Sequence, residues 1–259
     1  MRVCSAEALL VDVGELSRGD RVVSFLSAEH GRLRGVAKGA QRKYSRFSGQ
    51  LQPLATVQLT WFEKESSDLV RIRDLEMVHT AEALRRDLEG LLLTSYVAEH
   101  LSVFAQEREA SPELYRLTRA VVQALEQGAE HDLILRYFEA WVLRLAGLLA
   151  YELDCPECGV PLAERAVLPD LGETLVCTSC SEAAGAEGML VLQGTLELVR
   201  ASRSLSPSRF AAFETSAASM AQLEEVLTRI RRRFLGFELK SHGVIAETFR
   251  RLQRVERGA

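Results

Sequence analysis

Thr56-Val-Gln-Leu-Thr-Trp-Phe62 gives the clearest indication of how the first part of the chain folds. Its apolar side chains Val57, Leu59 and Trp61 fall on every second residue. That period of two is typical of a strand with one face buried in a core. The next apolar run, Leu69-Val-Arg-Ile-Arg73, alternates in the same way. Both runs therefore predict half-buried strands.

Three further short apolar runs precede this stretch: Ala8–Val13, Arg21–Leu26 and Arg32–Ala37. Turn-forming residues separate the runs from one another. Five strands in roughly 75 residues suit a small closed barrel, of which the OB-fold is the five-stranded version. We therefore expect an OB-fold barrel over residues 1–79.

After His79 the apolar period lengthens to that of a helix. A serine followed by proline, Ser111-Pro112, is typical of a helix start, and Gly128 suits the end of that helix. The helical segments that we expect are Leu84–Leu101, the stretch from Ser111, the stretch from Asp132 to Leu148, Leu190–Ala201 and Ser219–Leu239. The predicted fold class is therefore multi-domain α+β, with the amino-terminal barrel followed by a carboxy-terminal helical bundle.

Two paired cysteines give the most specific ligand pattern in the chain. Cys155-Pro-Glu-Cys158 and Cys177-Thr-Ser-Cys180 are separated by the 18 residues from 159 to 176. Two such pairs at this spacing are typical of a zinc ribbon, in which each turn supplies two thiolates to one tetrahedral ion. We expect one structural Zn²⁺ held by the four thiolates Cys155, Cys158, Cys177 and Cys180.

The cysteine segment interrupts the helical part of the chain. Asp154–Glu187 has few large apolar residues, so we expect the metal to hold this insertion together. Because four protein thiolates leave no open coordination position, the ion is expected to be structural and not catalytic. The predicted domains are 1–79 for the barrel, 80–153 and 188–259 for the two parts of the helical domain, and 154–187 for the insertion.

A basic segment spans the third predicted strand and the loop that follows it. From His30 to Phe47 the chain has no acidic residue, and glycines allow close backbone approach. Cations interspersed with aromatic rings suit phosphate contacts combined with base stacking. The nucleic-acid-binding residues that we predict are Arg32, Arg34, Lys38, Arg42, Lys43, Tyr44, Arg46 and Phe47, together with Arg71 and Arg73.

The alternative is a solvated loop whose charges only keep a barrel edge soluble. If the segment does bind nucleic acid, the more exposed of Trp61 and Phe62 is expected on the same surface. A second group of cations could extend the path or could be a polar helix face paired with Glu224, Glu225 and Glu238. This second group comprises Arg229, Arg231, Arg232, Arg233, Lys240, Arg250, Arg251, Arg254 and Arg257.

Composition narrows the class of protein. A hydrophobic fraction of 47% and a charged fraction of 26% are those of an ordinary globular protein, and the net charge of −4 argues against coating nucleic acid by bulk charge. Glu7 and Asp12 interrupt any signal peptide, and charges interrupt the longest apolar stretch, so we expect a cytoplasmic protein without membrane segments. The chain contains neither a phosphate-binding loop nor a common hydrolase motif, and its five histidines are scattered, so we expect no enzyme activity.

The order of these parts resembles that of the RecO family of bacterial recombination mediators. The residues that carry the resemblance are Glu7–Val13, the stretch Gly31–Ala37, the loop Lys38-Gly-Ala-Gln-Arg-Lys43 and the two cysteine pairs. The resemblance spans essentially the whole chain. It implies an OB-type barrel, a helical domain and an inserted zinc ribbon.

The resemblance also implies a function. Proteins of this family bind single- and double-stranded DNA, anneal complementary strands, act with RecR and help RecA replace single-strand-binding protein. The alternative from another class is a zinc-stabilised adaptor that recruits proteins and has no DNA activity. A metal-dependent nuclease or deaminase is disfavoured because a closed four-cysteine site offers no catalytic position.

Overall fold

The computed structural model describes residues 2–17, 19–64, 66–171, 174–245 and 247–248. Its contacts divide the chain into two compact units. The first comprises Met1–Glu126 together with Leu239–Ala259, and the second comprises Gln127–Glu238.

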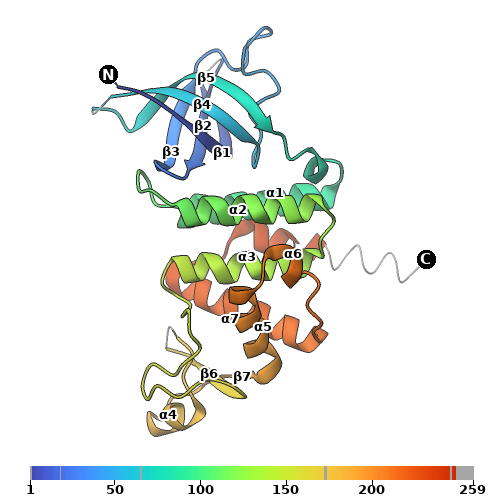
Figure 1. Cartoon of the computed structure of the whole chain (residues 1–259). Helices are drawn as coiled ribbons and strands as arrows, with labels where there is room; N and C mark the ends of the chain where they lie inside the picture. Colours follow the sequence, from blue (N-terminus) through green and yellow to red (C-terminus); the bar gives the residue numbers. More distant parts are fainter. Residues whose placement is uncertain (1, 18, 65, 172–173, 246, 249–259) are drawn as a thin grey trace, which may run out of the picture. The chain divides into compact units, whose positions relative to one another are not determined.

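Five strands form a barrel at the start of the first unit (Figure 1). Their order is β1-β2-β3-β5-β4, and β4 pairs back onto β1, which closes the ring. The strands are β1 (Arg2–Ser17), β2 (Asp20–Ser27), β3 (Gly31–Ala37), β4 (Thr56–Glu63) and β5 (Leu69–His79). The five expected strands and the OB-type fold are thus confirmed, although most strands extend further than their apolar runs.

The ring contains one short parallel seam, between β3 and β5. Only the stretch Arg34–Val36 of β3 pairs there, with Leu69–Arg71 of β5. The other pairings are antiparallel, and β1 is long enough to pair with β2 in one half and β4 in the other. The seam is therefore the weakest part of the barrel wall.

The alternating residues of the strands fill the barrel. Phe25 and Trp61 are fully buried and their ring centroids lie 5.3 Å apart. Val57 and Leu59, which sequence alternation placed on one face with Trp61, are also fully buried. The period of two in β4 thus identifies the core-facing side of the strand.

Two helices follow the barrel within the first unit, α1 (Leu88–Phe104) and α2 (Pro112–Glu126). The Tyr115 hydroxyl of α2 donates to Glu7 Oε1 of β1 at 2.7 Å, and Arg119 pairs with the same carboxylate. Leu84, expected at the start of a helix, lies instead in a single 3-10 turn, η1 (Glu82–Arg85).

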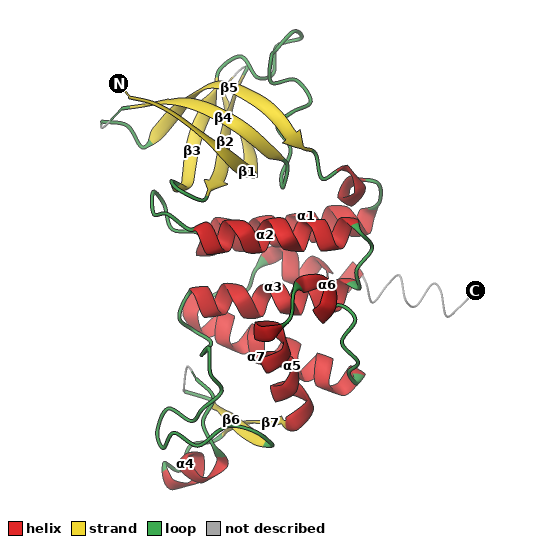
Figure 2. Cartoon of the chain, viewed as in Figure 1, coloured by secondary structure: helices red, strands yellow, loops and turns green. Residues whose placement is uncertain are grey.

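The second unit is built on four helices, α3 (His131–Leu145), α5 (Gln193–Ser204), α6 (Pro207–Phe210) and α7 (Ala217–Leu235). Figure 2 shows a two-stranded antiparallel sheet beyond them, formed by β6 (Arg165–Pro169) and β7 (Gly188–Leu192), with the short helix α4 (Thr178–Ala183) in the segment that joins its strands. The helix α7 ends where Gly236 takes a left-handed conformation at φ 75°. Among the described residues, no helix combines the length and apolar content that crossing a membrane requires.

Another secondary-structure expectation was wrong. Leu190 and Leu192 were assigned to a helix, but they lie in β7, which pairs with β6. They are 43% and 50% exposed, whereas Val191 between them is fully buried. This period of two over a run of five residues is too short for sequence analysis to distinguish from the start of the adjoining helix.

Candidate metal centre and nucleic-acid interface

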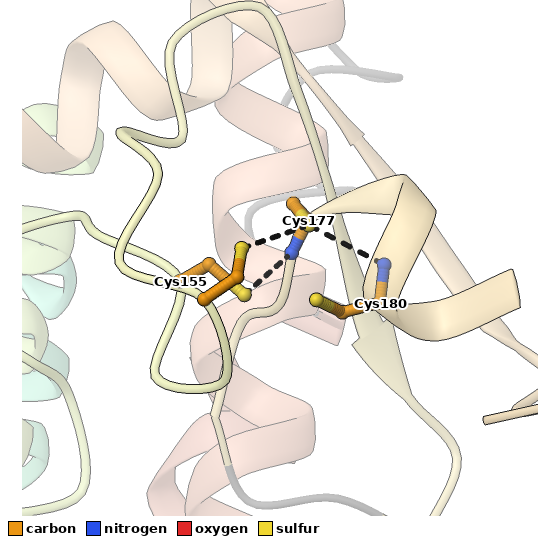
Figure 3. Close-up of side chains that lie close together, drawn as sticks. Cys155, Cys177 and Cys180 are labelled. Atoms are coloured by element: carbon orange, nitrogen blue, oxygen red, sulfur yellow. Dashed lines mark hydrogen bonds between the residues drawn. The ribbon is translucent and has the colours of Figure 1, made fainter. Parts of the chain in front are cut away.

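The four cysteines lie on two backbone turns that face each other. In the first turn, Gly159 N donates to Cys155 O at 2.8 Å, and Gly159 adopts a φ of 73° that favours glycine. In the second turn, Cys177 is the N-cap of α4, and its sulfur accepts from Cys180 N at 3.4 Å. Figure 3 shows Cys155 on its loop opposite Cys177 and Cys180 at the start of α4.

The sulfur atoms are placed to bind one ion. All four lie within 4.8 Å of one another, and Cys158 Sγ is 3.7 Å from Cys177 Sγ. Sulfur atoms at about 2.3 Å from a central Zn²⁺ would lie about 3.8 Å apart, whereas a disulfide needs about 2.05 Å. The cluster therefore fits a tetrahedral metal ion, and all the cysteines are free thiols.

Backbone hydrogen bonds favour the ligating form of Cys155. Burial alone would raise the pKa of this thiol, but N–H groups of Cys177, Glu157 and Cys158 point at its sulfur and lower the pKa to about 6. The neighbouring sulfur of Cys177 instead raises the pKa of Cys180. Four thiolates in such proximity require a cation to offset their repulsion, which is what a bound metal supplies.

The insertion also has packing of its own. Leu162, Ala166, Leu168, Leu175 and Val176 are buried, so the segment has a larger apolar core than its sequence suggested. Its second strand is tied to α7 because the Gln222 side chain donates to Leu190 O at 3.1 Å and accepts from Leu192 N at 2.9 Å. The cysteine cluster, the buried apolar residues around the two-stranded sheet and the Gln222 hydrogen bonds therefore all hold this segment in place.

The basic loop, residues 38–55, connects β3 to β4 and projects from the barrel in Figure 2. It is a series of tight turns with three buried anchors in the barrel core, Ala40, Phe47 and Ala55. At its start Gly39 N donates to Asp20 Oδ1 at 2.7 Å, and at its end Leu54 N donates to Leu10 O at 2.7 Å. The loop is therefore held at both ends and in the middle.

Between these anchors the loop exposes its cations and one aromatic ring. Tyr44 is 91% exposed, and Lys43 Nζ lies 5.7 Å from the centre of its ring. Within the described part of the chain, no carboxylate lies within ion-pair distance of the loop's four cations, Lys38, Arg42, Lys43 and Arg46. The loop thus presents positive charge around an accessible aromatic face.

One predicted aromatic contact was wrong in its placement. Phe47 is 2% exposed and packs inside the barrel with Arg46 stacked over it at 4.9 Å, so its ring cannot stack on a base. Of the neighbouring pair on β4, Trp61 is fully buried and Phe62 is the more exposed. Arg73 lies 5.8 Å from the Phe62 ring on the outer face of the barrel.

The remaining predicted cations divide into two kinds. Arg71 and Arg73 of β5 are exposed, without an ion pair among the described residues. Arg32 and Arg34 of β3 both contact Glu107, at 3.1 Å and 3.5 Å. Sequence reasoning missed Glu107, because no pattern in the sequence links a position after α1 to a strand more than 70 residues earlier.

The second cationic group is largely paired with acids within its own unit. Arg229 contacts Glu225 at 2.6 Å, Arg232 contacts Glu238 at 3.3 Å, and Arg231 is 1% exposed. The paired helix face, weighed as the alternative, is therefore correct for Arg229 and Arg232, whereas Arg231 is buried. Glu224 contacts Arg136 of α3 at 3.1 Å. Arg250, Arg251, Arg254 and Arg257 lie outside the described residues.

Two family models match the chain. The model described as recombination protein O N terminal matches residues 1–81, and the model described as recombination protein O C terminal matches residues 85–243. The first covers the barrel, and the second covers the helices together with the cysteine insertion.

Curated relatives agree with these models. DNA repair protein RecO of Anaeromyxobacter sp. (strain K) is 35% identical over 172 residues, which are 66% of each protein. The protein of the same name from Koribacter versatilis is 30% identical over 70% of this chain and 74% of its own length. That of Syntrophus aciditrophicus is 27% identical over 93% of this chain and 94% of its own length. The chain therefore belongs to the recombination protein O family of DNA repair proteins.

Proposed function

We propose that this protein is a DNA-binding recombination mediator that holds single strands on its barrel and anneals them to complementary strands. The observation that carries the proposal is the fixed basic loop, in which a 91% exposed Tyr44 stands among cations without carboxylate partners in the described chain. Phosphates would replace counterions at Lys38, Arg42, Lys43 and Arg46. Exposed Arg71 and Arg73 would extend this surface across β5.

Annealing needs no bond-making residue in this mechanism. The cations hold phosphates, and the Tyr44 ring stacks on a base without using its hydrogen-bonding edge. A base held in this way remains available to pair with a second strand. Binding double-stranded DNA follows from the same phosphate contacts, which do not read sequence. We therefore propose a protein without enzyme activity that works in the cytoplasm at the nucleoid.

The cysteine cluster has a supporting role in this proposal. We propose that the ion is Zn²⁺, because four thiolates in a tetrahedron suit zinc and leave no open position for a substrate. The zinc stabilises the insertion between α3 and α5. By family membership, the partners that we propose are RecR, RecA and single-strand-binding protein, with the mediator loading RecA on coated strands.

One assay tests the proposed function. Complementary oligonucleotides are mixed with the full chain, without nucleotide, and scored for binding, duplex formation and cleavage. Duplex formed faster than without protein supports the mediator. DNA left unbound supports the protein-recruiting adaptor, and shortened products support an enzyme. Either of these two results would overturn the proposal.

A further inference from the structure

The strap, residues 105–111, connects α1 to α2 and lies along β3. Arg32 N donates to Gln106 O at 3.2 Å, and Arg108 N donates to Arg32 O at 3.1 Å. These bonds fall on the first half of β3, whereas β5 pairs only with Arg34–Val36. The strap therefore completes the barrel wall beside the short β3–β5 seam.

The backbone of the strap is closely fitted to the barrel. A Cβ atom on Gly31 would lie 1.9 Å from Glu109 O, so only glycine admits the strap at this distance. Arg108 adopts a φ of 60°, and its guanidinium binds Glu63 together with Ser67 O. Because both sides of the strap are held in this way, its main chain has a fixed path.

This path brings one carboxylate onto the predicted nucleic-acid surface. Glu107 Oε1 is 3.1 Å from Arg32 Nη2 and 3.5 Å from Arg34 Nε. The Arg32 guanidinium is positioned further by donating from Nε to Ala105 O at 3.0 Å. Carboxylate and phosphate oxygens accept hydrogen bonds from guanidinium groups in the same way. Glu107 thus gives these guanidinium groups the same kind of oxygen acceptor that a phosphate of a bound strand would give them.

We propose that Glu107 is a built-in competitor for nucleic-acid phosphate. In the free protein it neutralises Arg32 and Arg34, and a bound strand displaces it. The Glu107 side chain is 50% exposed, so it can turn into water while the strap backbone stays in place. This inference rests on the proposed function. We expect this competition to make binding selective. Only a strand that the basic loop already holds would gain enough binding free energy to displace the Glu107 carboxylate.

The test compares two matched variants of the full chain, Glu107→Gln and Glu109→Gln. Each removes one charge from the strap, but no arginine within the described residues pairs with Glu109. Binding of a fluorescent oligothymidine is measured at several salt concentrations. Glu107→Gln should tighten binding roughly threefold at low salt and steepen the salt dependence by up to about two phosphate contacts. An equal effect of Glu109→Gln would reduce the result to net charge and overturn the inference.

Introducing Arg32→Gln into the wild type and into the Glu107→Gln variant tests whether Glu107 affects binding through Arg32. The loss of affinity caused by Arg32→Gln should be small beside an intact Glu107 and larger in the Glu107→Gln protein. Equal losses in the two backgrounds would show that Arg32 and Glu107 are not coupled in binding. A wild-type protein that binds no oligonucleotide would overturn the proposed function itself, and this inference with it. Binding by wild type with no response to Glu107→Gln would overturn the inference alone.

Discussion

The guanidinium of Arg231 donates to Glu139 Oε1 at 2.9 Å, and both side chains are 1% exposed. Arg231 lies on α7 and Glu139 on α3, so this buried ion pair joins two helices of the second unit. Arg136 contacts the other oxygen of Glu139 at 3.0 Å, and Arg231 also contacts Glu238 at 2.9 Å. The centre of the helical unit is thus a charged network and not an entirely apolar core.

We expect Arg231→Ala to lower the free energy of unfolding by about 3–5 kcal/mol, because it removes a guanidinium group that contacts the buried carboxylate of Glu139. The control is Arg229→Ala, two residues earlier on the same helix, where the side chain is 39% exposed. That change should cost less than about 1 kcal/mol. Urea unfolding followed by circular dichroism measures both. Equal costs would contradict a structural role for the buried pair.

The strands and most helices could be predicted from the sequence because their apolar residues repeat with a clear period. Val57, Leu59 and Trp61 lie in the barrel core, where their alternation placed them. The cysteine cluster was also predictable, since ligand spacing constrains a metal site more tightly than propensity constrains a helix. Its four sulfur atoms converge in the structure.

Other features depend on contacts that leave no local pattern. Arg231 stands in a run of arginines that resembles a solvated helix face, yet its partner Glu139 is 92 residues away in the chain. Phe47 and Tyr44 lie among the same basic residues in the sequence, but the Phe47 ring is buried in the barrel core whereas the Tyr44 ring is exposed. The periodicity and charge of the sequence do not distinguish two such neighbouring residues. The path of the loop backbone determines which of their side chains is buried.

Tyr44 and Phe47 should therefore respond differently to replacement by alanine. Tyr44→Ala should weaken single-strand binding by about 1–3 kcal/mol through lost stacking, and Tyr44→Trp should retain it. Phe47→Ala should instead lower the unfolding free energy by about 3–5 kcal/mol, because it leaves a cavity in the barrel. Oligonucleotide titration and thermal unfolding of the same preparations measure the two effects. Tyr44→Ala binding as well as wild type would remove this ring from the interface.

The metal assignment predicts the stoichiometry of cysteine variants. Cys155→Ser should abolish tight zinc binding, because three thiolates no longer complete the tetrahedron. Cys4→Ser is the matched control, since Cys4 is a buried cysteine of the barrel and lies outside the cluster. Atomic emission of purified proteins should give one equivalent of zinc for wild type and Cys4→Ser. One full equivalent retained by Cys155→Ser would reject the site.

The close contact between the strap and β3 predicts that alanine lowers the stability more at Gly31 than at Gly49. Gly31→Ala should cost more than about 2 kcal/mol, since it combines a left-handed φ of 63° with a clash against Glu109 O. Gly49→Ala has a similar φ of 74° but no atom within 4 Å of the added carbon, so only the backbone strain of about 1 kcal/mol applies. Thermal unfolding compares them. A Gly31→Ala protein as stable as Gly49→Ala would mean that the strap does not lie against β3.

The role of the basic loop in binding nucleic acid is tested by measuring single-strand affinity against salt concentration for the double variant Lys38→Glu with Arg42→Glu. Both side chains are exposed on the anchored basic loop, so the fold should be retained. The matched control is Arg165→Glu with Arg209→Glu, which makes the same charge change at exposed residues of the second unit.

We expect the loop variant to bind oligothymidine at least about tenfold more weakly than wild type at low salt. The slope of log affinity against log salt should flatten by about two phosphate contacts. The control variant should differ little from wild type in both quantities. If the loop variant keeps the wild-type affinity and slope, or if the control loses as much, the basic loop is not the nucleic-acid site.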